Sequence, residues 1–292
     1  MQNNNMKAII PVAGFGTRLF PATKNLKKAF LPILDKDGLL KPVILILLEQ
    51  LEQAGIKEIC LVIGEEEKEI YEEYFKPLTK EHYDKLSENK KKIENSIVRI
   101  GKNITYVVQK ERKGFGHAVY LCKNFIGNEP FLLLLGDTIY TSSINENCMI
   151  QMINVYSKYK LPIISMHKID KENVIHYGVL HGKWEDDEES ILRLDSIKEK
   201  PTVEYAQDNL IVKTKDSDDN YYAVFGQYIL TPEIFDILEK DINSSTNNEV
   251  ELTSALEKLR LSIGTIGYVV KGKSFDVGIT EAYYNTMLNY SK

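Results

Sequence analysis

The 292-residue sequence contains few cysteines and no CxxC pair. Its three cysteines, Cys60, Cys122 and Cys148, are widely separated along the chain. This spacing argues against a zinc site and predicts free, buried thiols in a reducing cytoplasm.

Long apolar runs are also missing. No run approaches the ~20 residues that a helix needs to cross a bilayer. Residues 1–6 (MQNNNM) have neither the basic start nor the apolar stretch of a signal peptide. We therefore expect a soluble globular protein of the cytoplasm that has no membrane partner.

The sequence has no excess of positive charge. Its formal net charge is −5, so nothing favours binding of a nucleic acid through bulk charge. Any phosphate site must therefore be a local cluster of cations inside an acidic protein. Hydrophobic residues make up 43% of the chain, which is enough for a sizeable core in one large domain or two small ones.

Short apolar runs alternate with amphipathic stretches through the first half of the chain. The predicted strands cover residues 8–13, 58–63, 104–109 and 131–135, and the predicted helices cover 41–54, 65–75 and 116–125. The run FLLLL at 131–135 is typical of a fully buried central strand. Apolar strands separated by helices predict a parallel sheet covered on both faces, in a doubly wound α/β fold with a Rossmann-like half.

The second half has a different pattern. The predicted strands cover 162–167, 177–184, 191–197, 221–230 and 263–270, polar loops such as 213–220 join them, and the predicted helices cover 249–261 and 281–290. We expect this half to extend the same sheet with mixed strands and to add a small antiparallel lobe. No repeat or linker divides the chain, so we predict one domain over 1–292, with halves of about 1–140 and 141–292. The charged segment 81–95 is typical of a solvated helix or insertion.

A glycine-containing loop follows the first predicted strand, within the stretch IIPVAGFGTRLFPATK at residues 9–24. Gly14 and Gly16 allow a close backbone approach at the carboxyl end of a strand, where open α/β sheets bind ligands. A tight strand-to-helix turn would have the same G-x-G pattern. The dinucleotide fingerprint requires a third glycine where this chain has Leu19, which disfavours a dehydrogenase. No G-K-[ST] sequence follows, so the P-loop pattern fails as well.

Cations follow these glycines closely. Five of them lie in one segment: Arg18, Lys24, Lys27, Lys28 and Lys36. An arginine supplies a planar fork suited to phosphate oxygens, and a lysine supplies a mobile point charge. Pro21 and Pro32 argue against a regular helix between them. We predict an ordered loop that wraps a triphosphate, with a solvated basic loop as the alternative.

These residues are part of a longer pattern. The segments GFGTRLFPATK and KKAFLPILDK resemble the signature of sugar-1-phosphate nucleotidyltransferases, in particular their uridylyl-transferring branch. Further blocks follow in the family's order: VVQKERKGFGHAV from Val107, LLLLGD from Leu132, YGV from Tyr177, KEKP from Lys198, FGQYIL from Phe225, NEVELTSAL from Asn248 and KGKSFDVG from Lys271. The resemblance implies a Mg²⁺-dependent enzyme that makes UDP-glucose and pyrophosphate from UTP and glucose 1-phosphate.

The resemblance also assigns nucleotide-binding and catalytic residues. It implies that Gly14, Gly16 and Thr17 hold the nucleotide and that Gln109 and Gly114 contact the base. The implied catalytic residues are Arg18 and Lys28 on the triphosphate, Asp137, and Lys200 on the sugar phosphate.

The sugar side of the implied site lies in the second half of the sequence. Gly178 would let the sugar approach the backbone, Glu199 would accept hydrogen bonds from hydroxyl groups, and Tyr228 aligns with a sugar-side aromatic. Tyr228 is equally typical of a core strand. His117 is expected in the first turn of a helix, and Trp184 in edge packing.

Two aspartates are the candidate metal ligands. Asp137 ends the most apolar strand, and Asp276 lies in the turn F-D-V-G. Mg²⁺ commonly takes one or two protein carboxylates and completes its shell with phosphate oxygens and water. Either aspartate alone would be an ordinary turn residue; together, in blocks that resemble the family's, they favour a metal site.

One departure from the family pattern leaves selectivity open. The uridylyltransferases have P-K-E before the apolar L-P, where this chain has Lys27, Lys28 and Ala29. The alternatives are the same chemistry with dTTP and glucose 1-phosphate, or with CTP and another sugar phosphate. A non-catalytic paralogue that binds a sugar nucleotide is the alternative from another class, and Ala29 alone favours it. Family members often assemble, so a homo-oligomer is compatible with the resemblance.

Overall fold

The computed structural model describes residues 6–215, 219–244 and 249–292. Part of the predicted polar loop 213–220 and the first residue of the block 248–256 lie outside these ranges. The strands are β1 (Lys7–Pro11), β2 (Pro32–Leu34), β3 (Leu40–Pro42), β4 (Ile59–Ile63), β5 (Ile104–Val108), β6 (Phe131–Leu134), β7 (Thr138–Ser142), β8 (Ile163–Ile169), β9 (Gly178–Trp184), β10 (Ile191–Glu199), β11 (Val212–Lys213), β12 (Asp219–Leu230), β13 (Ile266–Val269) and β14 (Gly272–Asp276).

Helices connect most of these strands. The α-helices are α1 (Val43–Gln53), α2 (Lys68–Phe75), α3 (Lys80–Asp84), α4 (Glu88–Gly101), α5 (Phe115–Tyr120), α6 (Lys123–Ile126), α7 (Cys148–Tyr159), α8 (Val203–Asn209), α9 (Glu233–Ser244), α10 (Leu252–Ile263) and α11 (Thr280–Asn289). Five 3-10 turns also occur: η1 (Thr17–Leu19), η2 (Ala22–Lys24), η3 (Lys28–Phe30), η4 (Glu65–Glu67) and η5 (Lys171–His176). Among the described residues, none of these helices has both the length and the apolar character needed to cross a bilayer.

The first half of the chain forms the parallel part of a ten-stranded sheet. The strands lie in the order β5-β4-β1-β6, and each neighbouring pair is parallel. All residues of β4 and β6 are buried, because helices cover both faces of the sheet. The prediction of a central FLLLL strand is confirmed, since β6 lies between β1 and β12.

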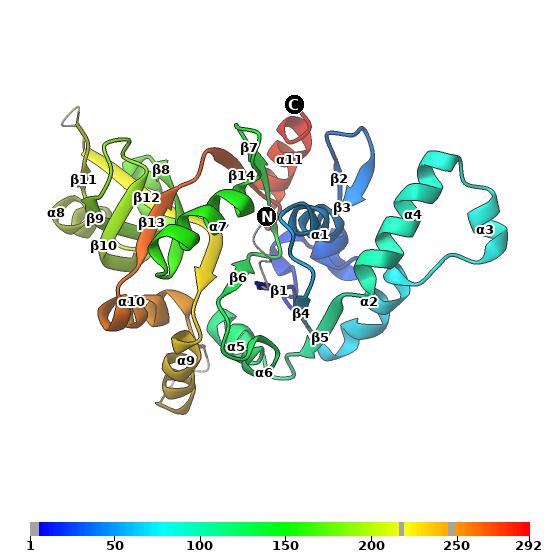
Figure 1. Ribbon diagram of the computed structural model, residues 1–292, viewed down its shortest axis with the longest axis horizontal. Coiled ribbons are helices and arrows are strands. Elements are labelled where there is room, and N and C mark those ends of the chain that lie inside the picture. The colour runs from blue at the N-terminus through cyan, green and yellow to red at the C-terminus, as the bar shows by residue number, and fades with distance from the viewer. Residues whose placement is uncertain (1–5, 216–218, 245–248) are drawn as a thin grey trace.

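The second half continues the same sheet with mixed strands. β12 is antiparallel to β6, and the order then runs β8, β13, β10 and β9. β12 has 12 residues, and its first part also pairs with β9, which closes these five strands into a ring. Figure 1 shows β9, β11 and α8 at one end of the long axis and α3 at the other. The predicted α/β fold with a small antiparallel lobe is confirmed.

Some predicted element boundaries were wrong. The helix predicted over 116–125 is divided into α5 and α6, and the strand predicted over 263–270 begins only at Ile266. Gly264, with φ of +81°, ends α10 and lets the chain turn before that strand. The sequence analysis also missed β2, β3, β7, β14, α7, α8 and α9.

The charged segment 81–95 forms part of α3 and most of α4. α4 packs against α1 and α2, and Arg99 Nη2 donates to Glu52 Oε2 on α1 at 3.1 Å. Most of the segment's charged side chains are exposed, which agrees with a solvated helix.

The three cysteines are free and buried, as predicted. Cys60 on β4 and Cys122 after α5 place their Sγ atoms 3.4 Å apart. This hydrogen bond, together with burial, raises the pKa of the Cys122 thiol. Burial raises the pKa of the Cys148 thiol to about 12. All three side chains are small core residues, and the raised pKa values leave Cys122 and Cys148 with little thiolate character.

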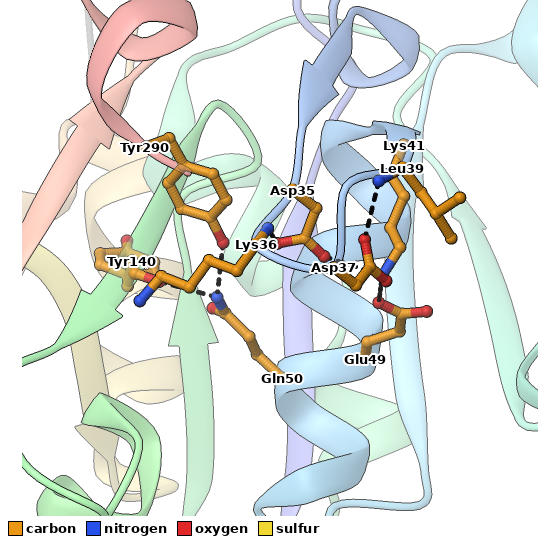
Figure 2. Close-up of polar contacts among 9 residues, drawn as sticks. All are labelled: Asp35, Lys36, Asp37, Leu39, Lys41, Glu49, Gln50, Tyr140 and Tyr290. Carbon is orange, nitrogen blue, oxygen red and sulfur yellow. Dashed lines mark hydrogen bonds and ion pairs between the residues drawn. The ribbon is translucent and has the colours of Figure 1, made fainter. Parts of the chain in front are cut away.

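A buried lysine joins the β2–β3 hairpin to α1. Lys41 on β3 contacts the carboxylates of Asp35 and Glu49 at 2.7 Å and that of Asp37 at 2.6 Å. Figure 2 shows these three acidic residues around Lys41. Burial alone would lower the pKa of Lys41, but its hydrogen bonds to three carboxylates outweigh this and raise it. The cluster fixes the hairpin that directly follows the cationic loop.

Gln50 connects α1 to two further elements. Its Nε2 donates to the backbone oxygen of Tyr140 on β7 at 2.8 Å and to the hydroxyl of Tyr290, after α11, at 3.2 Å. Figure 2 shows the Gln50 amide between these two tyrosines. The N-terminal hairpin, β7 and the C-terminal helix therefore share one helix, α1, as their support.

We expect Lys41→Met to lower the free energy of unfolding by about 3 kcal/mol. The substitution leaves partly buried carboxylates without their cation, and breaking a buried ion pair costs about 3–5 kcal/mol. Urea denaturation measures this effect. Lys76→Met is the control, because the Lys76–Glu73 pair is exposed and such pairs contribute about 0–1 kcal/mol. Equal losses in the two variants would contradict a stabilising role of the cluster.

Candidate active site

A large cavity lies at the carboxyl ends of the parallel strands. Its volume is about 1370 Å³. The first half of the chain contributes residues 11–15 at the end of β1, residues 109, 112, 114 and 115 after β5, and residues 135–137 after β6. The second half contributes Lys200 after β10 and residues of α9, α10 and the segment before α10. This is the edge where open α/β sheets bind ligands. Among the described residues, none of the charged segment 81–95 lines the cavity.

The cationic loop contains the three short turns η1, η2 and η3 between β1 and β2, and no α-helix. Thr23 Oγ1 donates to the backbone oxygen of Gly16 at 2.8 Å and so fixes the turn. The prediction of an ordered loop is confirmed. Gly14, Arg18 and Lys28 line the cavity, whereas Gly16 and Thr17 lie outside the set of lining residues.

Asp137, Asp276 and Lys28 meet at one point of the site. Lys28 Nζ forms a hydrogen bond and ion pair with Asp137 Oδ2. A Cβ atom added to Gly278 would lie 2.8 Å from Asp276 Oδ1, 2.9 Å from Asp137 Oδ2 and 3.5 Å from Lys28 Nζ. Burial, and then the charge of Asp137, raise the pKa of Asp276, while Lys28 and Arg18 act in the opposite direction. The structure thus brings together charged residues from three distant parts of the sequence: Arg18 and Lys28, Asp137, and Asp276.

Gln109 and Gly114 lie close together at the end of β5. Gln109 Nε2 donates to the backbone oxygen of Gly114 at 3.2 Å and lies 3.2 Å from His117 Nδ1. Val250, before α10, accepts from Gly116 N at 2.9 Å and donates to Lys113 O at 2.8 Å. The second half of the chain therefore holds this loop in place. His117 lies in the first turn of α5, as predicted.

Gly178, Glu199 and Lys200 form a second group, where β9 begins and β10 ends. Gly178 and Glu199 are register partners, and Glu199 Oε2 accepts from Thr253 Oγ1 of α10 at 2.7 Å. Lys200 Nζ lies 3.6 Å from Glu199 Oε1. Lys200 has φ of +40°, and such strain in a residue other than glycine is concentrated at functional sites. Of this group, only Lys200 lines the large cavity.

Tyr228 belongs to the core of the sheet. It lies on β12, is 6% exposed and does not line the cavity. Burial and the nearby Glu199 raise the pKa of its hydroxyl. Tyr228 therefore belongs to the core rather than to the cavity wall.

The sequence analysis missed a cation next to the glycine loop. The Arg112 guanidinium carbon lies 3.2 Å from the centre of the exposed Phe15 ring. Glu67 is 1% exposed and contacts Arg112 at 3.7 Å and Lys27 at 3.0 Å. A buried carboxylate needs such partners. Glu67 therefore links the loop that contains Lys27 to the loop that contains Arg112. No motif in the sequence pairs these residues.

Comparisons with known proteins identify the family of the chain. The family model described as nucleotidyl transferase matches residues 7–292. A UTP–glucose-1-phosphate uridylyltransferase of Staphylococcus epidermidis is 35% identical over 98% of this chain and 92% of its own. A crystal structure of UDP-glucose pyrophosphorylase complexed with UDP-glucose is 34% identical, with a TM-score of 0.79 and 98% of both chains covered. The UTP-bound enzyme of Acinetobacter baumannii is 27% identical, with a TM-score of 0.78 over 98% of this chain and 93% of its own.

We expect Gly114→Ala to destabilise the protein more than Gly127→Ala. Both glycines have positive φ, +91° and +68°, so both substitutions introduce backbone strain of about 1–3 kcal/mol. A Cβ on Gly114 would also lie 2.7 Å from Val250 O, whereas one on Gly127 has nothing within 4 Å. Urea denaturation of the two variants isolates the contact with Val250. Equal destabilisation would show that this contact does not constrain the loop.

Proposed function

The chain belongs to the nucleotidyl transferase family, and from this premise we propose that it transfers the uridylyl group of UTP to glucose 1-phosphate. A phosphate oxygen of glucose 1-phosphate forms a bond to the α-phosphorus of UTP, and the bond from that phosphorus to pyrophosphate breaks. The products are UDP-glucose and pyrophosphate. The names of the relatives support this choice of substrates, and the observation that carries it is one cavity lined by Arg18, Lys28, Asp137 and Lys200.

The reaction needs no side chain to act as a base. A phosphate monoester is largely dianionic at pH 7 because its second pKa is ~6. The chain must instead align the two substrates for in-line attack and stabilise the charge that develops on pyrophosphate. Arg18 and Lys28 place positive charge on the cavity wall for the triphosphate, and Lys200 does so for the phosphate of the sugar.

In this proposal, different residues bind the nucleotide and the sugar. Three lining residues hold the nucleotide: Gly14, Gln109 and Gly114. Of these, Gln109 and Gly114 contact the nucleotide base. Gly16 and Thr17 shape the glycine-containing loop. Glu199 and Gly178 receive the sugar hydroxyls and ring. Tyr228 is buried in the core and supports this side of the site rather than touching the sugar.

Asp137 and Asp276 fit a Mg²⁺ ion. Their oxygens converge on one point, as the distances from a Cβ on Gly278 show, and the raised pKa of Asp276 reflects its burial and the charge of Asp137. Among the described residues, no group of three or more acidic, histidine or cysteine side chains gathers to bind a metal, so two carboxylates would leave room for phosphate oxygens and water. When bound, Mg²⁺ supplies positive charge to the triphosphate.

Three further features belong to the proposal. We propose that residues 1–292 form one nucleotidyltransferase domain, which is supported by the sheet that runs through both halves. The buried free thiols support a cytoplasmic location. A homo-oligomer stays a prediction from the family resemblance.

The direct test is pyrophosphate release from the purified protein with glucose 1-phosphate and Mg²⁺. UTP, dTTP, CTP and ATP are supplied separately, and we expect strong release with UTP and none when Mg²⁺ or the sugar phosphate is omitted. Faster release with another nucleotide would overturn the assignment of UTP and keep the chemistry. Nucleotide binding without release from any of the four would favour the non-catalytic alternative.

Arg18→Ala and Lys28→Ala should each slow turnover about 100- to 1,000-fold. Each removes one preorganised group that stabilises developing charge, which typically costs about 2.7–4 kcal/mol. Lys36→Ala is the matched control, since Lys36 belongs to the same cationic segment but lines the separate cavity next to Asp35 and Gln50. The assay is the same pyrophosphate release at saturating substrate. Near-normal turnover in both test variants would remove these residues from the mechanism.

A further inference from the structure

The side-chain amide of Gln109 is held in one orientation. Gln109 follows β5, its backbone nitrogen donates to Ile63 O at 2.8 Å, and the residue is 6% exposed. Its Nε2 atom lies 3.2 Å from Gly114 O and 3.2 Å from His117 Nδ1. A backbone carbonyl can only accept, so the amide nitrogen, and not its oxygen, must face Gly114.

This orientation determines the state of His117. Nε2 of Gln109 carries two hydrogens; one is donated to Gly114 O, and the other points to His117 Nδ1. Nδ1 can accept only in a neutral imidazole whose proton is on Nε2. Burial, and then Lys113, lower the pKa of His117 against a smaller opposite effect of Glu111, which favours the neutral form.

We propose that His117 is a positioning residue that presents Gln109 Oε1 to the cavity as a hydrogen-bond acceptor. This inference rests on the proposed function, and it specifies the class of base. Uracil and thymine carry an N–H group at ring position 3 and can donate to Oε1. Neutral cytosine has a lone pair at that position, which would face another acceptor. The arrangement therefore selects bases that carry the N3–H donor, because the wrong base leaves buried polar groups unpaired.

Rotation of the Gln109 amide by half a turn would reverse this selection. While His117 keeps its proton on Nε2, the rotated amide would place Oε1 against two acceptors, Gly114 O and His117 Nδ1, so both contacts would become repulsive. Without His117 Nδ1, only the Gly114 carbonyl opposes the rotation. The amide could then present its nitrogen to the cavity more often, and discrimination against cytosine would weaken.

Calorimetric affinities for UTP and CTP test the proposal. The wild-type protein should prefer UTP, and His117→Leu should reduce the ratio of the two Kd values about fivefold, as expected for loss of one hydrogen bond. His117→Asn keeps an acceptor near the position of Nδ1 and should retain most of the preference. The control is His82→Leu, because His82 is an exposed histidine on α3; this variant should change neither affinity.

Several results would overturn the proposal. The first is equal wild-type affinity for UTP and CTP, and the second is an unchanged Kd ratio in His117→Leu. The third is an equal loss of affinity for both nucleotides in that variant, which would indicate a merely structural role. If His117→Leu does not fold, ¹⁵N NMR of the wild-type histidines decides: the proposal requires Nδ1 of His117 to be unprotonated at pH 7. Absence of pyrophosphate release by the wild type would count against uridylyl transfer only, because the Kd ratio does not depend on turnover.

Discussion

The site depends on two carboxylates that the fold forces together. Asp276 ends β14 and Asp137 directly precedes β7, and these strands pair antiparallel with Thr138 opposite Asp276. Val277 N also donates to the backbone oxygen of Asp137 at 2.8 Å. The register of this two-stranded ribbon therefore fixes the distance between the two side chains. Desolvation, and then the like charge of Asp137, raise the pKa of Asp276, and positive charge is needed beside the pair.

The protein supplies that positive charge selectively. Of the five cations between Arg18 and Lys36, only Arg18 and Lys28 line the cavity. Lys27 is paired with the buried Glu67, and Lys36 lines the smaller cavity beside the hairpin. The position of Lys28 in turn depends on the hairpin that follows it, which Lys41 and its three carboxylates attach to α1. A structural ion cluster outside the cavity thus supports the geometry of the proposed site.

The parts that could be predicted from the sequence have local signals. Continuous apolar runs identified β1, β4 and β6, because strands buried on both faces must be apolar throughout. Gly14, Arg18, Lys28 and Asp137 follow such strands or lie within a dense motif, so their common edge could be inferred from strand order alone. The fold class and the residues at this edge of the cavity came from these signals, whereas lining residues such as Arg112 and Asp241 did not.

Other parts have no local signal. The ribbon of β7 and β14 joins TIYTS and GKSFD, short segments of which neither alternates clearly in polarity, and it is defined only by pairing across the chain. The contact of Glu67 with Lys27 and Arg112 joins three segments, so no spacing rule identifies it. Tyr228 illustrates the opposite difficulty, since an aromatic residue on a strand has the same pattern whether it faces a ligand or, as here, the core.

Ala29 has a physical explanation in this arrangement. Position 29 is 3% exposed and lines the cavity directly after Lys28. A carboxylate there would add a third negative charge to a site that already holds Asp137 and Asp276, and a buried charge needs a partner of its own. Lys27, the neighbouring cation, is already committed to Glu67. Alanine avoids that third charge and leaves Lys28 with Asp137, so Lys28 and the nearby Arg18 remain the cations that offset the two aspartates.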